Sequence, residues 1–121
     1  MSVLHHPSSA AKWGSLSIAE QLGNIGSEVE RAMRAHDAQN AARFDSALAR
    51  ALELFDLTAG DARWRGPRRR EILRAREEFC RLFFDRAVTR ESHAGLKRYF
   101  LAFAVAARRE REESFSRARS D

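Results

Sequence analysis

Arginine is the residue type that could do chemistry in this sequence, and it is concentrated in residues 62–76. This segment holds seven arginines and a single acid, Glu71. The planar guanidinium group binds phosphate or carboxylate oxygens through two parallel hydrogen bonds. The free N–H groups at the start of a helix attract the same anions, and Pro67 is suited to a first helical turn because its missing N–H is not needed there. The three arginines that follow it would oppose the helix dipole, so we expect them to be kept for binding an anion.

A second group of cations follows on the last predicted helix, and Trp64 lies between two arginines of the first group. An indole ring can stack on a nucleic-acid base or on a guanidinium group. The sequence therefore predicts a basic surface that binds RNA or single-stranded nucleic acid. The candidate nucleic-acid-binding residues are Arg63, Trp64, Arg65, Arg68, Arg69, Arg70, Arg74, Arg76, Lys97, Arg98, Arg108, Arg109 and Arg111. Two other interpretations stay open: the surface binds an acidic protein, or it is a solvated face whose arginines pair with Glu71, Glu77 and Glu78.

No pattern in the sequence is typical of an active site or a metal centre. Glu77 and Glu78 are adjacent on a predicted helix, where neighbouring side chains point about 100° apart, so they do not form a catalytic pair. Cys80 lies at core spacing among apolar residues, which raise the pKa of a thiol and make it inert. As the only cysteine it excludes an internal disulfide and a zinc site built on paired cysteines. His5 and His6 have no carboxylate or thiol nearby and are expected to be solvated. We therefore expect no catalytic residue, no metal site, no cofactor and no enzymatic activity.

The composition is typical of one globular, helix-rich domain. The chain has 121 residues, of which 44% are hydrophobic and 32% charged, with six glycines and two prolines. Its net charge of +5 is unevenly divided: residues 1–60 carry five basic and seven acidic side chains, and residues 61–121 carry 17 and 10. The basic second half is expected to attract nucleic acid or another acidic partner. No segment has the pattern of a signal peptide and no apolar run approaches 18 residues, so we expect a cytoplasmic protein that does not enter a membrane.

Apolar residues recur at helical spacing in four segments. Ser17 and Glu20 match a capping box at the start of the first segment. The predicted helices run from Ser17 to a polar break at 36–40, from 41 to about 57, from Pro67 to about Asp85, and from Ser92 or His93 onward. Short connections favour antiparallel neighbours, so the sequence predicts an all-α fold, an antiparallel up-down-up-down four-helix bundle. Its domain limits are a flexible N-terminal arm (1–14), the four-helix bundle (15–113) and a charged C-terminal tail (114–121).

Three glycines and one tryptophan carry further structural predictions. Gly23 and Gly26 flank the apolar stripe of the first helix and are expected to allow the close approach of a neighbouring helix. Gly60 is a plausible left-handed cap for the second helix. Trp13 could dock on the body from the N-terminal arm.

The sequence from Leu96 to Arg108, LKRYFLAFAVAAR, is similar to a helix of the four-helix-bundle proteins encoded in intervening sequences of bacterial 23S ribosomal RNA genes. The same superfamily includes the accessory variability protein of diversity-generating retroelements. Ser17-Ile-Ala-Glu20 resembles a short signature of this group, and residues 15–32 also resemble a separate family of small prokaryotic proteins. The first resemblance implies a ring-forming bundle without enzymatic activity. It also implies that a basic surface binds a reverse transcriptase and its RNA template, in support of error-prone cDNA synthesis.

The resemblance and the charge pattern together favour one function and leave one alternative. We expect a non-catalytic accessory protein that binds RNA or single-stranded nucleic acid, self-associates and supports a reverse transcriptase. By position, the contacts implied by the resemblance would fall on Arg63 to Arg76 and Arg98 to Arg111. The alternative is a protein-interaction module or an antitoxin-like regulator whose arginines bind an acidic protein.

Overall fold

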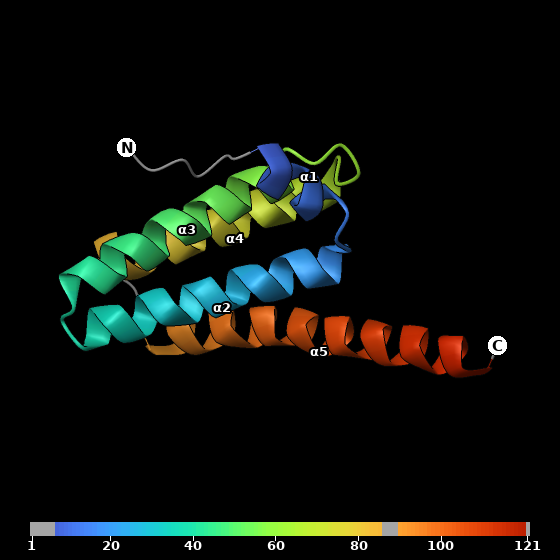
Figure 1. The fold of residues 1–121 in the computed structure, drawn as a ribbon. Coiled ribbons are helices and arrows are strands. Elements are labelled where there is room, and N and C mark those ends of the chain that lie inside the picture. Colours follow the sequence, from blue (N-terminus) through green and yellow to red (C-terminus); the bar gives the residue numbers. More distant parts are fainter. Residues whose placement is uncertain (1–6, 86–89, 121) are drawn as a thin grey trace.

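The computed structural model describes residues 7–85 and 90–120, and every regular element in these ranges is a helix (Figure 1). The chain is therefore all-helical in its described part, as the apolar periodicity predicted. The elements are α1 (Pro7–Gly14), α2 (Ile18–Asp37), α3 (Ala41–Ala59), α4 (Pro67–Phe84) and α5 (Arg90–Ser120).

Local sequence sets the starts of the three central helices. The predicted capping box of α2 is present: Glu20 N–H donates to Ser17 Oγ at 3.1 Å, and Ser17 N–H donates to Glu20 Oε1 at 2.9 Å. Asn40 caps α3 by accepting a hydrogen bond from the backbone N–H of Arg43 at 3.1 Å. Pro67 opens α4 as predicted. Side chains that satisfy free N–H groups in this way stabilise a helix start by about 1 kcal/mol.

The long helices lie side by side, and each runs opposite to the one before it (Figure 1). α2 makes its most extensive contacts with α3 and α5, while α4 packs more sparsely against the same two helices. The core lies between them and is built on an apolar stripe of α2 and on aromatic rings of α3, α4 and α5. Its fully or nearly fully buried members include Leu22, Ile25, Val29, Phe55, Ile72, Phe79 and Phe100. These contacts are consistent with a helical bundle.

The two glycines of α2 mark a close approach of a neighbouring helix. A Cβ atom added at Gly26 would lie 2.6 Å from Cβ of Phe100, and one added at Gly23 would lie 3.2 Å from the Cα of Ala104. Both neighbours are on α5, so the predicted reason for these glycines, a neighbouring helix, is confirmed. The missing side chains let α5 pack directly on the α2 backbone.

The N-terminal region differs from the sequence prediction. Residues 7–14, expected within a flexible arm, form helix α1. The predicted docking of Trp13 on the body is confirmed, because its side chain is buried in the core. The indole Nε1–H of Trp13 donates to Thr58 Oγ1 at 2.9 Å, and the carbonyl of Trp13 accepts from Gln21 Nε2 at 2.8 Å. These contacts join α1 to α3 and α2, and no local periodicity could have revealed them. His5 and His6 lie outside the described residues.

Three helix ends also differ from prediction. α5 continues to Ser120, where a charged tail was expected from residue 114. Gly60 has φ −81° and is not left-handed; the glycine with positive φ is Gly66, at +67°, immediately before Pro67. Of the predicted connection over residues 87–92, positions 86–89 lie outside the described residues, and α5 begins at Arg90. None of the helices in the described ranges is long and apolar enough to cross a membrane.

Candidate functional site

Arg63, the first of the predicted nucleic-acid-binding residues, is held by the protein itself. Its Nη2 lies 2.7 Å from Asp61 Oδ2 and also donates to the carbonyl of Leu16 at 2.7 Å, while its Nε lies 3.1 Å from Asp61 Oδ1. Hydrogen bonds from Arg63 lower the pKa of Asp61 to about 2, and Asp61 in turn raises the pKa of Arg63. Arg63 therefore ties the loop after α3 to the start of α2, and its guanidinium is largely committed to that task.

Trp64 does not offer an open stacking surface. The indole is half-buried against the core, and its Nε1–H donates to Gln21 Oε1 at 2.7 Å. The guanidinium of Arg63 lies over the ring, 4.5 Å from its centroid. One face of the ring therefore makes a cation–π contact with Arg63. Of the two roles predicted for Trp64, this contact matches stacking on a guanidinium group and not stacking on a base.

Two arginines of α4 also have acidic partners within the molecule. Arg68 Nη1 lies 3.3 Å from Glu71 Oε1, and Arg76 Nε lies 3.1 Å from Asp56 Oδ1 on α3. Tyr99 of α5 donates its hydroxyl to the same Glu71 oxygen at 2.7 Å. Burial, together with that carboxylate, raises the pKa of Tyr99 well above its ordinary value. These two ion pairs fit the interpretation of a solvated, salt-bridged face better than that of a free phosphate site.

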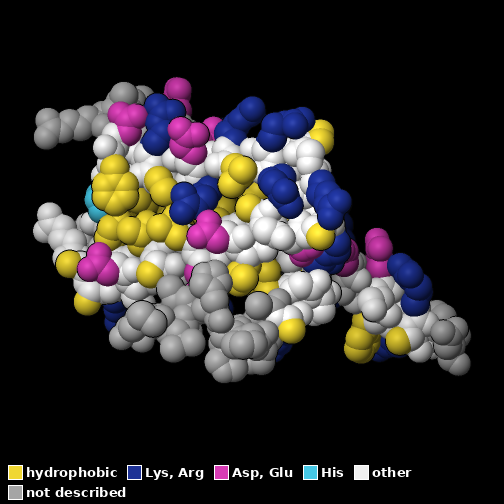
Figure 2. All heavy atoms as spheres, turned by 90° about the horizontal axis from the view of Figure 1, so that it is seen from above, with side chains coloured by type: hydrophobic (Ala, Val, Ile, Leu, Met, Phe, Trp, Pro, Cys, Tyr) yellow, Lys and Arg dark blue, Asp and Glu magenta, His cyan; other side chains and the backbone are white. Residues whose placement is uncertain are grey.

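The remaining arginines near the start of α4 are more available. The side chains of Arg65, Arg70 and Arg74 are exposed and have no hydrogen-bond or ion-pair partner within residues 7–85 and 90–120. Arg69 is half-buried, and its Nε is enclosed without a hydrogen-bond partner. Figure 2 shows cations gathered at the end of the molecule where α4 begins, and apolar side chains gathered toward the other end. Of the arginines predicted around the start of α4, Arg65, Arg70 and Arg74 are therefore the ones that could contact an anion.

The predicted cations of α5 do not form one site. Lys97 lines a groove beside α2 that also contains Glu30 and Asp37. Arg98, the next residue in the sequence, is exposed. Arg108, Arg109 and Arg111 are exposed two to four turns further along α5, toward the end where α4 begins. The structure thus separates the predicted residues of this helix into two groups.

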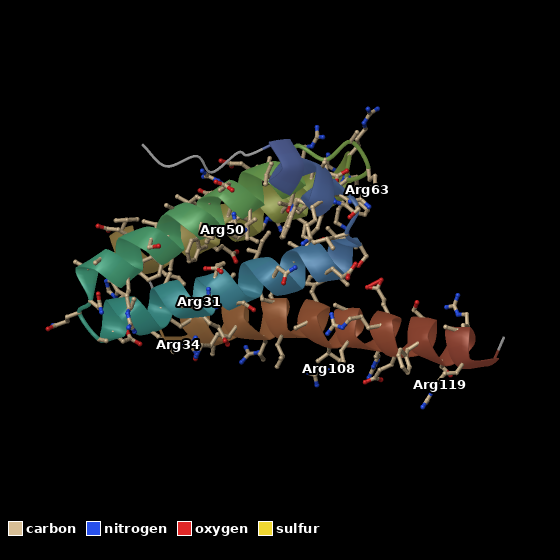
Figure 3. The ribbon with its side chains drawn as sticks, viewed as in Figure 1. Arg31, Arg34, Arg50, Arg63, Arg108 and Arg119 are labelled. Carbon is tan, nitrogen blue, oxygen red and sulfur yellow. The ribbon has the colours of Figure 1, made fainter. Side chains whose placement is uncertain are left out.

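Another basic site lies elsewhere, in an open groove of about 810 Å³ between α2 and α3. Arg31 and Arg34 of α2 and Arg43 and Arg50 of α3 line it, together with Ser46, Asn40 and a single carboxylate, that of Glu28. Figure 3 shows the labelled residues Arg31, Arg34 and Arg50 away from Arg63, which lies near the start of α2. We call this site the α2–α3 groove.

Two of the groove arginines are partly neutralised and two are not. Arg31 pairs with Glu28 at 2.9 Å, and Arg50 pairs at 3.0 Å with the buried carboxylate of Glu53, whose second oxygen has no hydrogen-bond partner. Arg34 and Arg43 are exposed and have no partner within the described ranges. Arg34 near the end of α2 suits the negative end of that helix dipole, but Arg43 in the first turn of α3 opposes the dipole. Arg43 therefore adds positive charge where helix stability alone would not favour it.

Sequence reasoning missed this groove, although a signal was present. Arg31 and Arg34 are three residues apart, and Arg43, Ser46 and Arg50 are spaced by three and four, on either side of the turn after α2. Residues at these spacings share a helix face, and the two helices of a hairpin place such faces side by side. The uneven division of charge along the chain pointed instead to residues 61–121.

Cys80 and the potential metal ligands were the other candidates for a functional site. Cys80, expected at a core position, is half-buried. No group of three or more potential metal ligands occurs among the residues that the structure describes. No protein-family model, no curated protein and no solved structure matches this chain.

Proposed function

We propose that this protein is an antiparallel four-helix bundle that acts without catalysis and binds RNA or single-stranded nucleic acid, with the α2–α3 groove as the main contact. One observation carries the proposal. All four arginines of residues 1–60 line this one groove, although that half of the chain has more acidic than basic residues. Two of these arginines are paired, with Glu28 and Glu53, and the two without partners give the groove an excess of positive charge.

The chemistry of the groove favours a phosphodiester backbone. Each guanidinium can donate two parallel hydrogen bonds to one phosphate, and Ser46 and Asn40 add polar groups between the arginines. The described lining contains no aromatic side chain, so the groove offers no surface on which a base could stack. We therefore expect contact with the backbone and little discrimination between sequences.

The exposed arginines near the start of α4 extend this proposal to a second basic surface. Arg65, Arg70 and Arg74 are exposed there, and a flexible single strand can follow separate basic surfaces on one protein. The resemblance of the last helix to retroelement accessory proteins favours RNA as the strand and a reverse transcriptase as the protein partner. An accessory protein of this kind would hold the template near the polymerase.

The charge of the groove sets the expected salt dependence. For single strands, log K falls with log salt with a slope of about −0.7 per phosphate contact. If each groove arginine neutralises one phosphate, the slope is about −3, and affinity falls roughly 50-fold between 50 and 200 mM salt.

The test compares two double variants that remove the same charge from different surfaces. Fluorescence anisotropy with a labelled single-stranded RNA is measured at both salt concentrations for wild type, Arg34→Ala/Arg43→Ala and Arg70→Ala/Arg74→Ala. None of these four side chains has a partner within the described residues, so neither variant is expected to unfold. We expect the groove variant to weaken binding about tenfold and to reduce the salt slope by about 1.4.

Each outcome assigns the function differently. If only the α4 variant weakens binding, the protein still binds RNA but the groove is the wrong site. If wild type binds no RNA at low salt, the nucleic-acid function is wrong, and a search for an acidic protein partner replaces it.

A further inference from the structure

α5 carries an exposed stripe with the spacing of a coiled-coil seam. Starting at residue 101, the stripe recurs at intervals of four, three, four, three and four residues, which is a heptad repeat. Its members are Leu101, Val105, Arg108, Glu112, Phe115 and Arg119. The side chains of Leu101, Val105 and Phe115 are 62%, 38% and 65% exposed. Only two other large apolar side chains in the described residues are comparably exposed, Leu73 and Phe84, and both lie on α4.

The second half of this stripe extends past the rest of the molecule. Ser17 Oγ donates to Glu110 Oε1 at 2.8 Å, so the start of α2 lies level with residue 110 of α5. Residues 111–119 continue as helix for about 14 Å beyond this point, and all of them are exposed (Figure 1). A projecting helix end that exposes a large aromatic ring and has few neighbours in its own chain is typical of a site of protein–protein interaction.

The stripe is complementary to itself in one register. In antiparallel coiled coils, a positions of one helix face d positions of the other. When the residue numbers of facing positions add to 220, Val105 faces Phe115 of the second copy, Arg108 faces Glu112, and Leu101 faces the aliphatic stem of Arg119. Because the pairing is two-fold symmetric, each contact occurs twice.

Other registers are less favourable by the same reasoning. Moving one helix by a heptad, to a sum of 213, places Leu101 against Glu112 and Val105 against Arg108. A sum of 227 places Arg108 against Arg119 and Glu112 against Phe115. A parallel pair would set Arg108 against its own copy and Glu112 against its own copy, and like charges at a seam oppose association.

We infer that two copies of this protein associate through α5 as an antiparallel two-helix seam over residues 101–119. The two bodies then lie end to end, because each projecting helix end covers the outer face of α5 on the other copy. The seam is about 28 Å long and contains four apolar contacts and two Arg108–Glu112 ion pairs. This inference involves different residues from the α2–α3 groove and does not depend on nucleic-acid binding.

Charge reversal tests the register. Sedimentation equilibrium of the full chain over a range of concentrations is measured for wild type, Arg108→Glu, Glu112→Arg and the double variant Arg108→Glu/Glu112→Arg. Each single reversal places like charges at two symmetric positions, and we expect it to weaken dimerisation at least about tenfold. The double reversal restores opposite charges and should return the dissociation constant to near the wild-type value.

A disulfide tests the antiparallel direction. In a Cys80→Ser background, Val105→Cys and Phe115→Cys proteins are mixed and oxidised. We expect the mixed disulfide between Cys at 105 and Cys at 115, and little disulfide in either protein alone. Circular dichroism of each variant confirms that the exposed substitutions leave the helices intact.

Three results would overturn the inference. A wild type that is monomeric at every concentration excludes the dimer, and a double reversal that stays as weak as the single variants excludes this register. Efficient self-linking of the Phe115→Cys protein would show a parallel pair instead.

Discussion

Gly26→Ala provides the sharpest test of the packing between α2 and α5. The new Cβ would lie 2.6 Å from the Cβ of Phe100, whereas an ordinary contact between such atoms is at least 3.4 Å. Relief needs a displacement of about 1 Å between two helices that pack along much of their length. Because Phe100 is 4% exposed and forms part of the core, the shift would also disturb the rings around it.

Two opposing terms set the magnitude. Replacing glycine by alanine inside a helix is favourable by about 1 kcal/mol. Overpacking a well-packed interface costs about 1–3 kcal/mol, and occasionally more. Since the contact is shorter than any that real Cβ atoms adopt, the overpacking term should lie at the upper end. We expect a net destabilisation of about 1–2 kcal/mol, which lowers Tm by roughly 3–8 °C for a domain of this size.

The assay is urea unfolding followed by circular dichroism, with two glycine positions as controls. Gly95→Ala makes the same exchange on α5, where the nearest atom is Arg98 Nη2 at 3.9 Å, and should stabilise by about 0.5–1 kcal/mol. Gly23→Ala, with a contact of 3.2 Å to the Cα of Ala104, should fall between the two. If Gly26→Ala were as stable as wild type while Gly95→Ala was stabilised, α5 would not pack against α2 at this point.

Two further predictions follow from shifted pKa values. Tyr99 is the only tyrosine, so absorbance at 295 nm reports its ionisation directly; burial and Glu71 raise its pKa, and we expect no phenolate near pH 10 until urea unfolds the protein. Because the folded-state pKa is the higher one, stability should decline as pH rises above 10, and an ordinary titration in the folded state would contradict the buried Tyr99–Glu71 contact. Asp61 has the opposite sign: its pKa of about 2 lies below the ordinary 3.8 because Arg63 donates to it, so it stabilises the fold above pH 4 and loses this effect between pH 4 and 2. We expect the stability difference between wild type and Asp61→Asn, about 1 kcal/mol after solvent screening, to shrink by most of this amount between pH 4 and pH 2 in urea titrations; a pH-independent difference would exclude ionisation as its cause.

Local sequence was sufficient to predict the helices because their signals are local. A capping box, an uninterrupted apolar stripe and a proline at a helix start each act within a few residues. Gly23 and Gly26 also indicated a close neighbour correctly, since glycine within an amphipathic helix costs stability unless something packs against it. Helix α1 as a whole and the C-terminal end of α5 were not predictable in this way. α1 is held by a hydrogen bond from Trp13 to a residue 45 positions away, and the projecting part of α5 has no apolar face toward its own core.

Which arginines of the predicted site are available depends on tertiary structure, and local sequence does not give this information. A cluster in sequence is not a cluster of available charge, because ion pairs are formed by tertiary structure. Arg63 and Arg76 pair with Asp61 and Asp56, and neither pairing follows from helical spacing. The nucleic-acid role of the thirteen predicted residues stays a prediction, and within that set the exposed arginines without partners are the ones to test first.

The α2–α3 groove shows why net charge by segment is a poor guide to a binding surface. Most of the seven acids of residues 1–60 lie outside the groove: Glu28 alone lines it, and the carboxylate of Glu53 is buried beneath Arg50. A helix distributes successive residues around its axis, so acids and bases that cancel in a sum can face different directions. An approaching polyanion responds to the local field within about 10 Å at moderate salt, and four arginines line the groove beside Glu28 and the buried Glu53. The relevant quantity is therefore the charge on each face of a helical hairpin, and by that measure the acidic half of this chain contains a basic groove that its net charge does not reveal.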